Sequence, residues 1–202
     1  MHITAIKQQV KRADRYSIYV DEKYSFSLSD TALLESRLVP GQELTPAEVK
    51  DLKRQSADDK VYSLALRYVA IRSRSRHELE TYLKRKEAPT ELIDRIMGRL
   101  SDLGFVDDEA FARVWVENRR LLKPVSRRRL MLELRQKRVP DDVVQIVLAD
   151  DETSDRDTLA ELVQRKRRQT KYQDDTKLMQ YLARQGYGYD DIKSALADDG
   201  SD

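Results

Sequence analysis

The chain has no cysteine, which excludes disulfide bonds and thiolate metal sites. Its only histidines are His2 and His77, too few for a histidine-based metal centre or a catalytic triad. No apolar run approaches the roughly 20 residues that a membrane-spanning helix needs. The first residues also lack the apolar segment of a signal peptide. We therefore expect a cytoplasmic protein that does not contact the membrane.

Motifs for catalysis are missing as well. There is no P-loop, no glycine-rich phosphate cradle and no metal-ligand spacing. Two acidic pairs, Asp107 with Asp108 and Asp190 with Asp191, are better explained as helix caps, because both pairs stand at expected helix starts. We expect no enzyme activity, no catalytic or metal-binding residue and no cofactor.

Charged residues are abundant instead. They make up 37% of the 202 residues, and 38 Lys and Arg nearly balance 36 Asp and Glu. This composition is typical of a soluble, helix-rich chain. The bases are nevertheless concentrated in two groups. The first basic cluster consists of Arg119, Arg120, Lys123, Arg127, Arg128 and Arg129. The second basic cluster consists of Arg165, Lys166, Arg167, Arg168 and Lys171.

Each basic cluster has two interpretations that the sequence leaves open. As a binding surface, either cluster can contact DNA phosphates or an acidic protein surface. Alternatively, the first cluster is a solvated helix face paired with Glu117 and Glu133. The second cluster is alternatively the hydrophilic end of a helix, where cations favour the C-terminal dipole. We take the members of both clusters as the candidate partner-binding and DNA-binding residues.

The N-terminal residues have the alternation of a β-sheet. Tyr16, Ile18 and Val20 alternate with polar residues, and a second alternating run follows at 24–28. Residues 21–23 are expected to form the turn of this hairpin, although no glycine is present there. A strand at about residues 3–11 is expected to join as a third, because a lone hairpin is only marginally stable.

Two helix signals follow the expected sheet. A short helix is expected at residues 30–36. The next helix is expected to begin at Pro46, because Thr45 can cap it and Glu48 can complete a capping box.

From Asp58 onward, one helical pattern occurs three times. A leucine pair at i, i+4 spacing marks the middle helix of each unit, and a favoured N-cap residue precedes each pair. The leucine pairs are Leu79 with Leu83, Leu130 with Leu134, and Leu178 with Leu182. The caps are Ser75, Ser126 and Asp174. Each unit is expected to start a first helix after an acidic residue, at Asp58, Asp107 and Asp155.

One such three-helix unit buries few apolar side chains and would be marginal alone. Tandem units that share faces predict a mainly α fold in an elongated, curved arrangement, preceded by a small N-terminal β-hairpin or three-stranded β extension. The expected domains are the β-rich extension with a short helix at 1–52, and three-helix repeats at 53–106, 107–153 and 154–202.

Four stretches resemble the RecX family of bacterial regulators of the RecA recombinase. They are RSRSRHELETYLKRK at 72–86, LSDLGFVDDEAFARVWVENR at 100–119, RRRLMLELRQKRVPDDVV at 127–144 and LVQRKRRQTKYQDDTKLMQYLARQGYGYDDI at 162–192. Their order and spacing, and above all the DLGFVDDEAFA segment, carry the resemblance. One departure concerns the end of each middle helix, where members often have glycine and this chain has Glu87, Arg138 and Gly186. We expect the first two turns to differ from the third, because a left-handed residue other than glycine costs about 1–2 kcal/mol.

The resemblance implies a protein that binds RecA, its nucleoprotein filament, or both. Such a protein lies in the helical groove of the filament and limits filament growth, ATP hydrolysis, strand exchange and coprotease activity. It would act in homologous recombination, DNA repair and the SOS response. We further expect a monomer, with single- or double-stranded DNA as a possible additional partner.

Two other functions remain open at this point. The basic clusters suit a sequence-tolerant DNA-binding helical protein that acts without RecA, and a salt titration would distinguish it. The helical repeats also suit an adaptor for another protein, which a pull-down recovering a different partner would favour.

Overall fold

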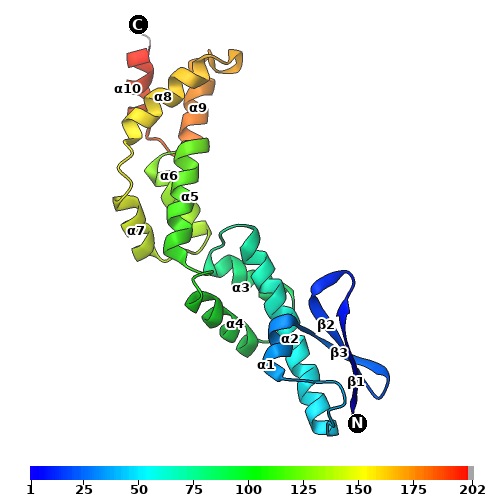
Figure 1. The fold of residues 1–202 in the computed structure, drawn as a ribbon. Helices are drawn as coiled ribbons and strands as arrows, with labels where there is room; N and C mark the ends of the chain where they lie inside the picture. The colour runs from blue at the N-terminus through cyan, green and yellow to red at the C-terminus, as the bar shows by residue number, and fades with distance from the viewer. Residues whose placement is uncertain (200–202) are drawn as a thin grey trace. The chain divides into compact units, whose positions relative to one another are not determined.

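The computed structural model describes residues 1–199 of the chain. They divide into two compact units, coloured by residue number in Figure 1. The first unit contains Met1–Arg72 and Leu79–Phe105. The second unit contains Ser73–Glu78 and the residues from Val106 onward.

The first unit begins with an antiparallel sheet of three strands in the order β1-β2-β3. The strands are β1 Ile3–Gln9, β2 Arg12–Val20 and β3 Lys23–Ser29. In the turn between β2 and β3, Asp21 and Glu22 have φ angles of 46° and 64°. Two left-handed residues are what a two-residue hairpin turn requires. The predicted hairpin and third strand are therefore confirmed, and Glu22 adopts a conformation that usually favours glycine.

Two helices, α1 Asp30–Ser36 and α2 Pro46–Ile71, follow the sheet. The predicted capping box is present at the start of α2: the Glu48 amide donates to the Thr45 hydroxyl (3.2 Å), and the Thr45 amide donates to the Glu48 carboxylate (2.6 Å). The helix start expected after Asp58 is wrong, because α2 runs through that position without interruption. The boundary expected between residues 52 and 53 therefore lies inside α2.

The sheet and α2 enclose the first hydrophobic core. Its buried side chains are Ile3, Ile18, Val20, Phe26, Leu28, Leu38, Leu44, Val49 and Leu52. A charged residue is buried beside them: the side chain of Arg15 is only 1% exposed and lies 3.0 Å from the Asp59 carboxylate of α2. Arg15 also donates to the carbonyl of Ser27 at 3.0 Å. Through these two contacts Arg15 of β2 joins α2 and β3.

The remainder of the first unit packs on the second half of α2. It contains helix α4 Thr90–Asp102 and residues 79–85 of helix α3 Arg76–Arg85. Tyr82 of α3 stacks on Tyr68 of α2 with the ring centroids 4.1 Å apart. The apolar face of these helices is buried and consists of Leu79, Leu83, Leu92, Ile93, Ile96, Met97 and Leu100.

The second unit contains two further groups of helices, each with its own core. The first group is α5 Asp108–Leu122, α6 Arg127–Gln136 and α7 Asp141–Ala149. The second group is α8 Asp155–Arg167, the short 3-10 helix η1 Thr170–Tyr172, α9 Asp175–Arg184 and α10 Tyr189–Asp199. The predicted leucine pairs of α6 and α9 are buried in these cores. For residues 1–199, the mainly α fold with three three-helix repeats and an N-terminal sheet is confirmed.

The turn after the middle helix is the same in all three repeats. Glu87, Arg138 and Gly186 have φ angles of 58°, 57° and 93°. Our expectation that the first two turns would differ from the third is therefore wrong. The backbone hydrogen bonds that close the turn, such as Val139 N to Leu134 O (3.2 Å), hold a left-handed residue even without glycine.

In the second unit, the residue that starts one middle helix contacts the end of another, and this arrangement occurs in two places. In the first copy, the Ser75 hydroxyl donates to the carbonyl of Lys137 at the end of α6 (2.9 Å). In the second copy, the Ser126 amide donates to the carbonyl of Gln185 at the end of α9 (3.1 Å). Within the second unit, two of the predicted cap residues, Ser75 and Ser126, thus each contact the end of the middle helix that follows in the chain.

A carboxylate completes each junction. The Arg76 amide donates to Asp108 (2.8 Å), and the Arg127 amide donates to Asp155 (3.0 and 2.9 Å to its two oxygens). In both cases an acidic residue at the start of the following repeat accepts from the first turn of a middle helix, where free amide groups favour negative charge.

Candidate functional site

The first basic cluster lies at the end of α5, in the loop after it and at the start of α6. Lys123 ends α5 because it precedes Pro124, which disfavours the helical conformation in the residue before it. Ser126 then starts α6, since its hydroxyl accepts from the Arg129 amide at 3.2 Å. The structure therefore brings the members of this cluster together, as the sequence predicted, but it gives them different environments.

Arg120 is a buried member of the first basic cluster. Its side chain is 11% exposed, and it donates to the carboxylate of Asp151 (2.7 Å) and to the carbonyl of Val125 (2.7 Å). Burial alone would disfavour the charged form of Asp151, but hydrogen bonds from Arg120 and Thr153 outweigh it and lower the pKa of Asp151. Arg120 therefore stabilises the fold and is not available to a partner.

Two more arginines are held by one buried carboxylate. Glu133 of α6 accepts hydrogen bonds from Arg119 (2.8 Å) and Arg129 (3.2 Å). It also accepts from the indole nitrogen of Trp115 (3.0 Å). The pairing with Glu133 that the alternative interpretation named is present for Arg119 and Arg129. The partly buried Trp115 packs beside Phe111 with the ring centroids 5.8 Å apart.

The remaining cations of the first basic cluster have exposed side chains. The exposed Arg127 donates to the carbonyl of Asp151 at 2.7 Å. The side chains of Lys123 and Arg128 are exposed and form no hydrogen bond or ion pair within residues 1–199. The structure thus narrows the available positive charge of this cluster to Lys123, Arg127 and Arg128.

The second basic cluster lies on the last turns of α8 and on η1. Arg167 is engaged: it donates to Asp199 (3.1 Å), to the carboxylate of Asp175 and to the carbonyl of Gln173 (2.9 Å). These bonds raise the pKa of Arg167 further, so it remains a charged structural contact that holds η1 and α9 to α8. Arg167, like Arg120 in the first basic cluster, therefore has a role in stabilising the fold.

Two tyrosines that no local sequence pattern connects with the cluster lie beneath its lysines. The Lys166 ammonium is 4.7 Å from the ring centre of Tyr181 and 5.3 Å from that of Tyr172. The Lys171 ammonium lies 5.5 Å from the Tyr172 ring. Both tyrosines are half-buried. The close approach of Tyr172 and Tyr181 (5.2 Å between centroids) depends on η1 and has no local sequence signal.

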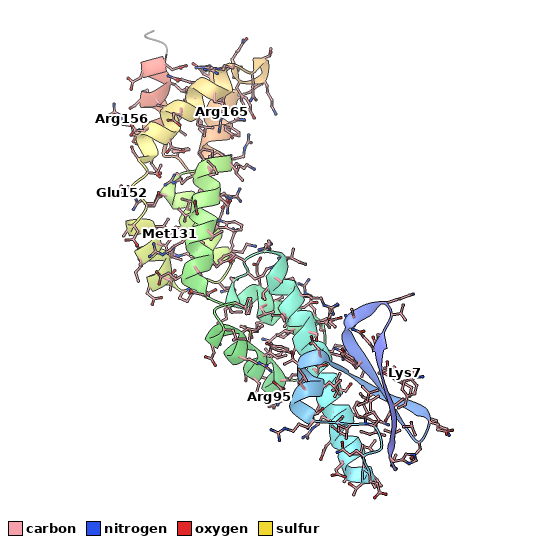
Figure 2. All side chains as sticks on the ribbon, in the orientation of Figure 1. Lys7, Arg95, Met131, Glu152, Arg156 and Arg165 are labelled. Atoms are coloured by element: carbon pink, nitrogen blue, oxygen red, sulfur yellow. The ribbon has the colours of Figure 1, made fainter. Side chains whose placement is uncertain are left out.

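Arg165 and Arg168 flank this lysine–tyrosine surface. Both side chains are exposed, and neither forms a hydrogen bond or ion pair with the part of the chain that the structure describes. Figure 2 labels Arg165, which extends from α8. The second basic cluster therefore offers Arg165, Arg168 and Lys171 with two aromatic rings beside them, an arrangement that suits a phosphate backbone and stacked bases.

Of the two predicted acidic pairs, Asp107 and Asp108 make contacts at helix starts, whereas no capping hydrogen bond is formed by Asp190 or Asp191 within residues 1–199. The Asp107 carboxylate accepts from the Glu109 and Ala110 amides at 2.8 and 3.0 Å and starts α5. Burial raises the pKa of its neighbour Asp108, although the hydrogen bond from the Arg76 amide opposes this. In residues 1–199 no group of three or more His, Cys, Asp and Glu is placed to hold a metal ion. No helix in the same range is long and apolar enough to cross a membrane.

Family comparisons agree with this architecture along the chain. The model for the RecX regulatory protein N-terminal domain matches residues 1–45. The models for the first, second and third RecX three-helix domains match 62–100, 107–148 and 154–196. The chain belongs to the RecX family. The 100–119 stretch that resembles RecX joins the first of these three-helix matches to the second.

Individual RecX proteins support the same assignment. Regulatory protein RecX of Lactobacillus delbrueckii subsp. bulgaricus is 34% identical over 148 residues, which cover 73% of this chain and 54% of that protein. Regulatory protein RecX of Listeria welshimeri is 29% identical over 202 residues, covering 96% of this chain and 74% of that protein. The chain therefore spans about half the length of the Lactobacillus relative.

Solved RecX structures share the fold. A crystal structure of regulatory protein RecX superposes with a TM-score of 0.69 at 25% identity, covering 97% of this chain and 98% of that one. The crystal structure of RecX from Lactobacillus salivarius gives a TM-score of 0.58 at 22% identity over 70% of this chain and 95% of that one, which indicates a shared fold.

Proposed function

We propose that this RecX family member is a non-catalytic regulator that binds RecA and the RecA–DNA filament and lowers its recombinase, ATPase and coprotease activities. The observation that carries the proposal is the match of four RecX family models, in chain order, to residues 1–45, 62–100, 107–148 and 154–196. In this proposal the protein acts in the cytoplasm as a monomer.

The charge distribution supports a polymeric partner. In each of the second and third repeats, some cations are used in folding while others remain available. The available cations are Lys123, Arg127, Arg128, Arg165, Arg168 and Lys171. Contacts to a filament from two neighbouring repeats of one unit act together, so that individually weak ionic contacts give useful affinity.

The test is the DNA-dependent ATPase of RecA. Adding this protein below the RecA concentration should lower the steady-state rate, because one molecule on a filament affects several RecA subunits. A variant with Arg128, Arg165 and Arg168 changed to Ala should inhibit less. The matched control changes Lys50, Lys53 and Arg54 of α2 to Ala, which removes the same charge from exposed positions outside both clusters. An unchanged ATPase rate at saturating amounts of folded protein rejects the proposal.

A second candidate function is binding to single-stranded DNA without RecA. The observation that favours it is the pair of half-buried rings, Tyr172 and Tyr181, beneath Lys166 and beside free arginines. Cationic grooves with aromatic platforms are typical of sequence-tolerant binding to single strands. Fluorescence anisotropy with a labelled oligonucleotide, without RecA and at several salt concentrations, tests it, and the absence of binding at low salt rejects it.

A further inference from the structure

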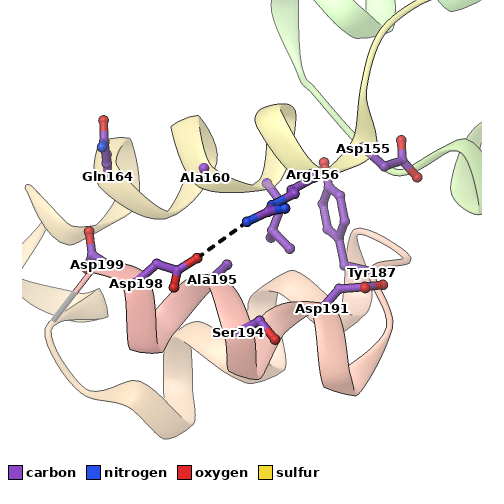
Figure 3. A pocket seen from close by; sticks show the side chains of 11 residues that line it. Asp155, Arg156, Ala160, Gln164, Tyr187, Asp191, Ser194, Ala195, Asp198 and Asp199 are labelled. Atoms are coloured by element: carbon purple, nitrogen blue, oxygen red, sulfur yellow. Dashed lines mark ion pairs between the residues drawn. The ribbon is translucent and has the colours of Figure 1, made fainter. Parts of the chain in front are cut away.

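A groove of about 740 Å³ lies between α8 and α10 of the third repeat. Its two walls are regular helix faces (Figure 3). The α8 wall carries Arg156, Leu159, Ala160 and Gln164, and the α10 wall carries Asp191, Ser194, Ala195, Asp198 and Asp199. The alanine on each wall leaves the middle of the groove wide, where larger side chains would fill the space between two packed helices. The groove therefore has an apolar floor, formed by Leu159, Ala160 and Ala195, between polar rims.

The rim on α10 is acidic, and two of its carboxylates are available. Asp191 is exposed and forms no hydrogen bond or ion pair with residues 1–199. Asp198 approaches Arg156 only to 4.0 Å, and both side chains are largely exposed, at 74% and 89%, so the pair is weak. Asp191 and Asp198 stand two helical turns apart, which separates them by about 10 Å along α10.

A buried hydroxyl provides a second sign of an unfilled site. Tyr187 lines the groove and is 6% exposed. Figure 3 shows its ring between the first turns of α8 and α10. Among the described residues, its hydroxyl has no hydrogen-bond partner. Buried polar groups in native proteins nearly always have one, so a group that donates to or accepts from this oxygen would complete the site.

We propose that this groove binds a protein segment that carries two arginine or lysine side chains, spaced to meet Asp191 and Asp198, with a small apolar residue between them over Ala160 and Ala195. The identification of that partner as RecA rests on the proposed function. Nucleic acid does not suit the groove, because the carboxylates repel phosphate. The third repeat then contacts protein through the groove and DNA through the second basic cluster.

The decisive variant of the full-length chain is Asp191→Asn with Asp198→Asn, which keeps side-chain size and removes two charges. Its control is Asp190→Asn with Glu161→Gln, which removes two charges from exposed positions on the same helices outside the groove.

Binding is measured to RecA without DNA and to a labelled oligonucleotide without RecA. We expect the groove variant to weaken RecA binding at least about tenfold, as for other lost interfacial charge pairs. Oligonucleotide binding should stay unchanged or become tighter, and the control should resemble the unaltered chain.

Three results overturn the proposal. The first is an equal loss of RecA binding in the groove variant and in the control, which would mean that RecA binding depends only on the net charge of the chain. The second is RecA binding unchanged in the groove variant. The third is loss of oligonucleotide binding in the groove variant, which would assign the groove to nucleic acid.

A separate probe distinguishes failure of the groove from failure of the proposed function. If the unaltered chain binds no RecA, the probe is a synthetic helical peptide with two arginines at the spacing of Asp191 and Asp198 and alanine elsewhere. We expect the unaltered chain to bind it and the groove variant to lose that binding. Absence of binding to both the peptide and RecA rejects the groove. Tyr187→Phe adds a finer readout, because loss of the hydroxyl should weaken binding severalfold while the chain stays folded.

Discussion

At the scale of single residues, Gly186 has the most restricted position among the glycines that the structure describes. Its φ is 93°, and an added Cβ would collide with the Ser126 hydroxyl and lie 2.8 Å from the Cβ of Arg129. We expect Gly186→Ala to lower the free energy of unfolding by about 2–3 kcal/mol, because backbone strain adds to overpacking at a junction.

The control for this prediction is another glycine. Gly98 lies in the interior of α4, and a Cβ there would meet nothing within 4 Å. Gly98→Ala should raise stability by about 0.5–1 kcal/mol. Thermal and urea unfolding of both variants test the pair, and equal effects would contradict the role of the junction.

Asp151 makes a contribution to the stability of the fold that depends on pH. Although burial opposes ionisation of this carboxyl, the hydrogen bonds of Arg120 and Thr153 lower the pKa of Asp151. A lowered folded-state pKa adds stability above the ordinary aspartate pKa of about 3.9, and this stability is lost as the pH falls through the folded value. Asp151→Asn should therefore lower Tm at neutral pH and reduce the fall in Tm below about pH 4.

The neighbouring Glu152 supplies the comparison for Asp151. It is exposed and has no side-chain hydrogen bond or ion pair within residues 1–199. Glu152→Gln should leave the curve of Tm against pH close to that of the unaltered chain. If Glu152→Gln and Asp151→Asn shift the curve equally, the Arg120 contact does not contribute as described.

Some single residues were beyond prediction from sequence. The alternation of β2 predicts core positions for Ile18 and Val20 and an exposed position for Arg15, whereas Arg15 is buried. Burial of Arg15 depends on Asp59 and Ser63 of α2, far along the chain. A local pattern of polar and apolar residues contains no information about such a partner, so long-range ion pairs remain hidden at this scale.

At the scale of helices and turns, local chemistry predicted much of the structure. The capping box at Thr45 and the caps at Ser126 and Asp174 are present. The expected start at Asp58 failed because residues 47–71 contain neither glycine nor proline to interrupt α2. An acidic residue favours a helix start but does not break a helix that is already running.

The junction between the second and third repeats yields a prediction for a helix end. Asp155 accepts from the Arg127 amide and lies 3.4 Å from Arg120. Asp155→Ala should lower the free energy of unfolding by about 1–2 kcal/mol, as for the loss of a helix cap. Asp157→Ala is the control, because Asp157 is also in the first turn of α8 but its carboxylate has no partner within residues 1–199. Equal losses in chemical denaturation would show that the effect comes only from the α8 dipole.

At the scale of the whole molecule, the repeat pattern and the order of motifs predicted the fold class and the family. The candidate site was predicted less well. Both basic clusters exist, but Arg119, Arg120 and Arg167 join separate segments through acidic partners, and Arg129 pairs with Glu133 within α6. Sequence locates a concentration of charge, whereas tertiary pairing decides how much of that charge is left for another molecule.

The cations that have no acidic partner within the fold should determine how oligonucleotide binding depends on salt. Each phosphate contact contributes about 0.7 to the slope of log affinity against log salt for a single strand. Changing Arg165, Arg168 and Lys171 to Ala should therefore reduce that slope by up to about 2 for oligonucleotide binding, and affinity should fall most at low salt. The Lys50, Lys53 and Arg54 triple variant should keep the original slope. A slope that is unchanged in the first variant would mean that the second basic cluster does not contact phosphate. A slope reduced equally in both variants would mean that only the net charge of the chain matters, because contacts at defined positions cannot depend on charges removed from α2.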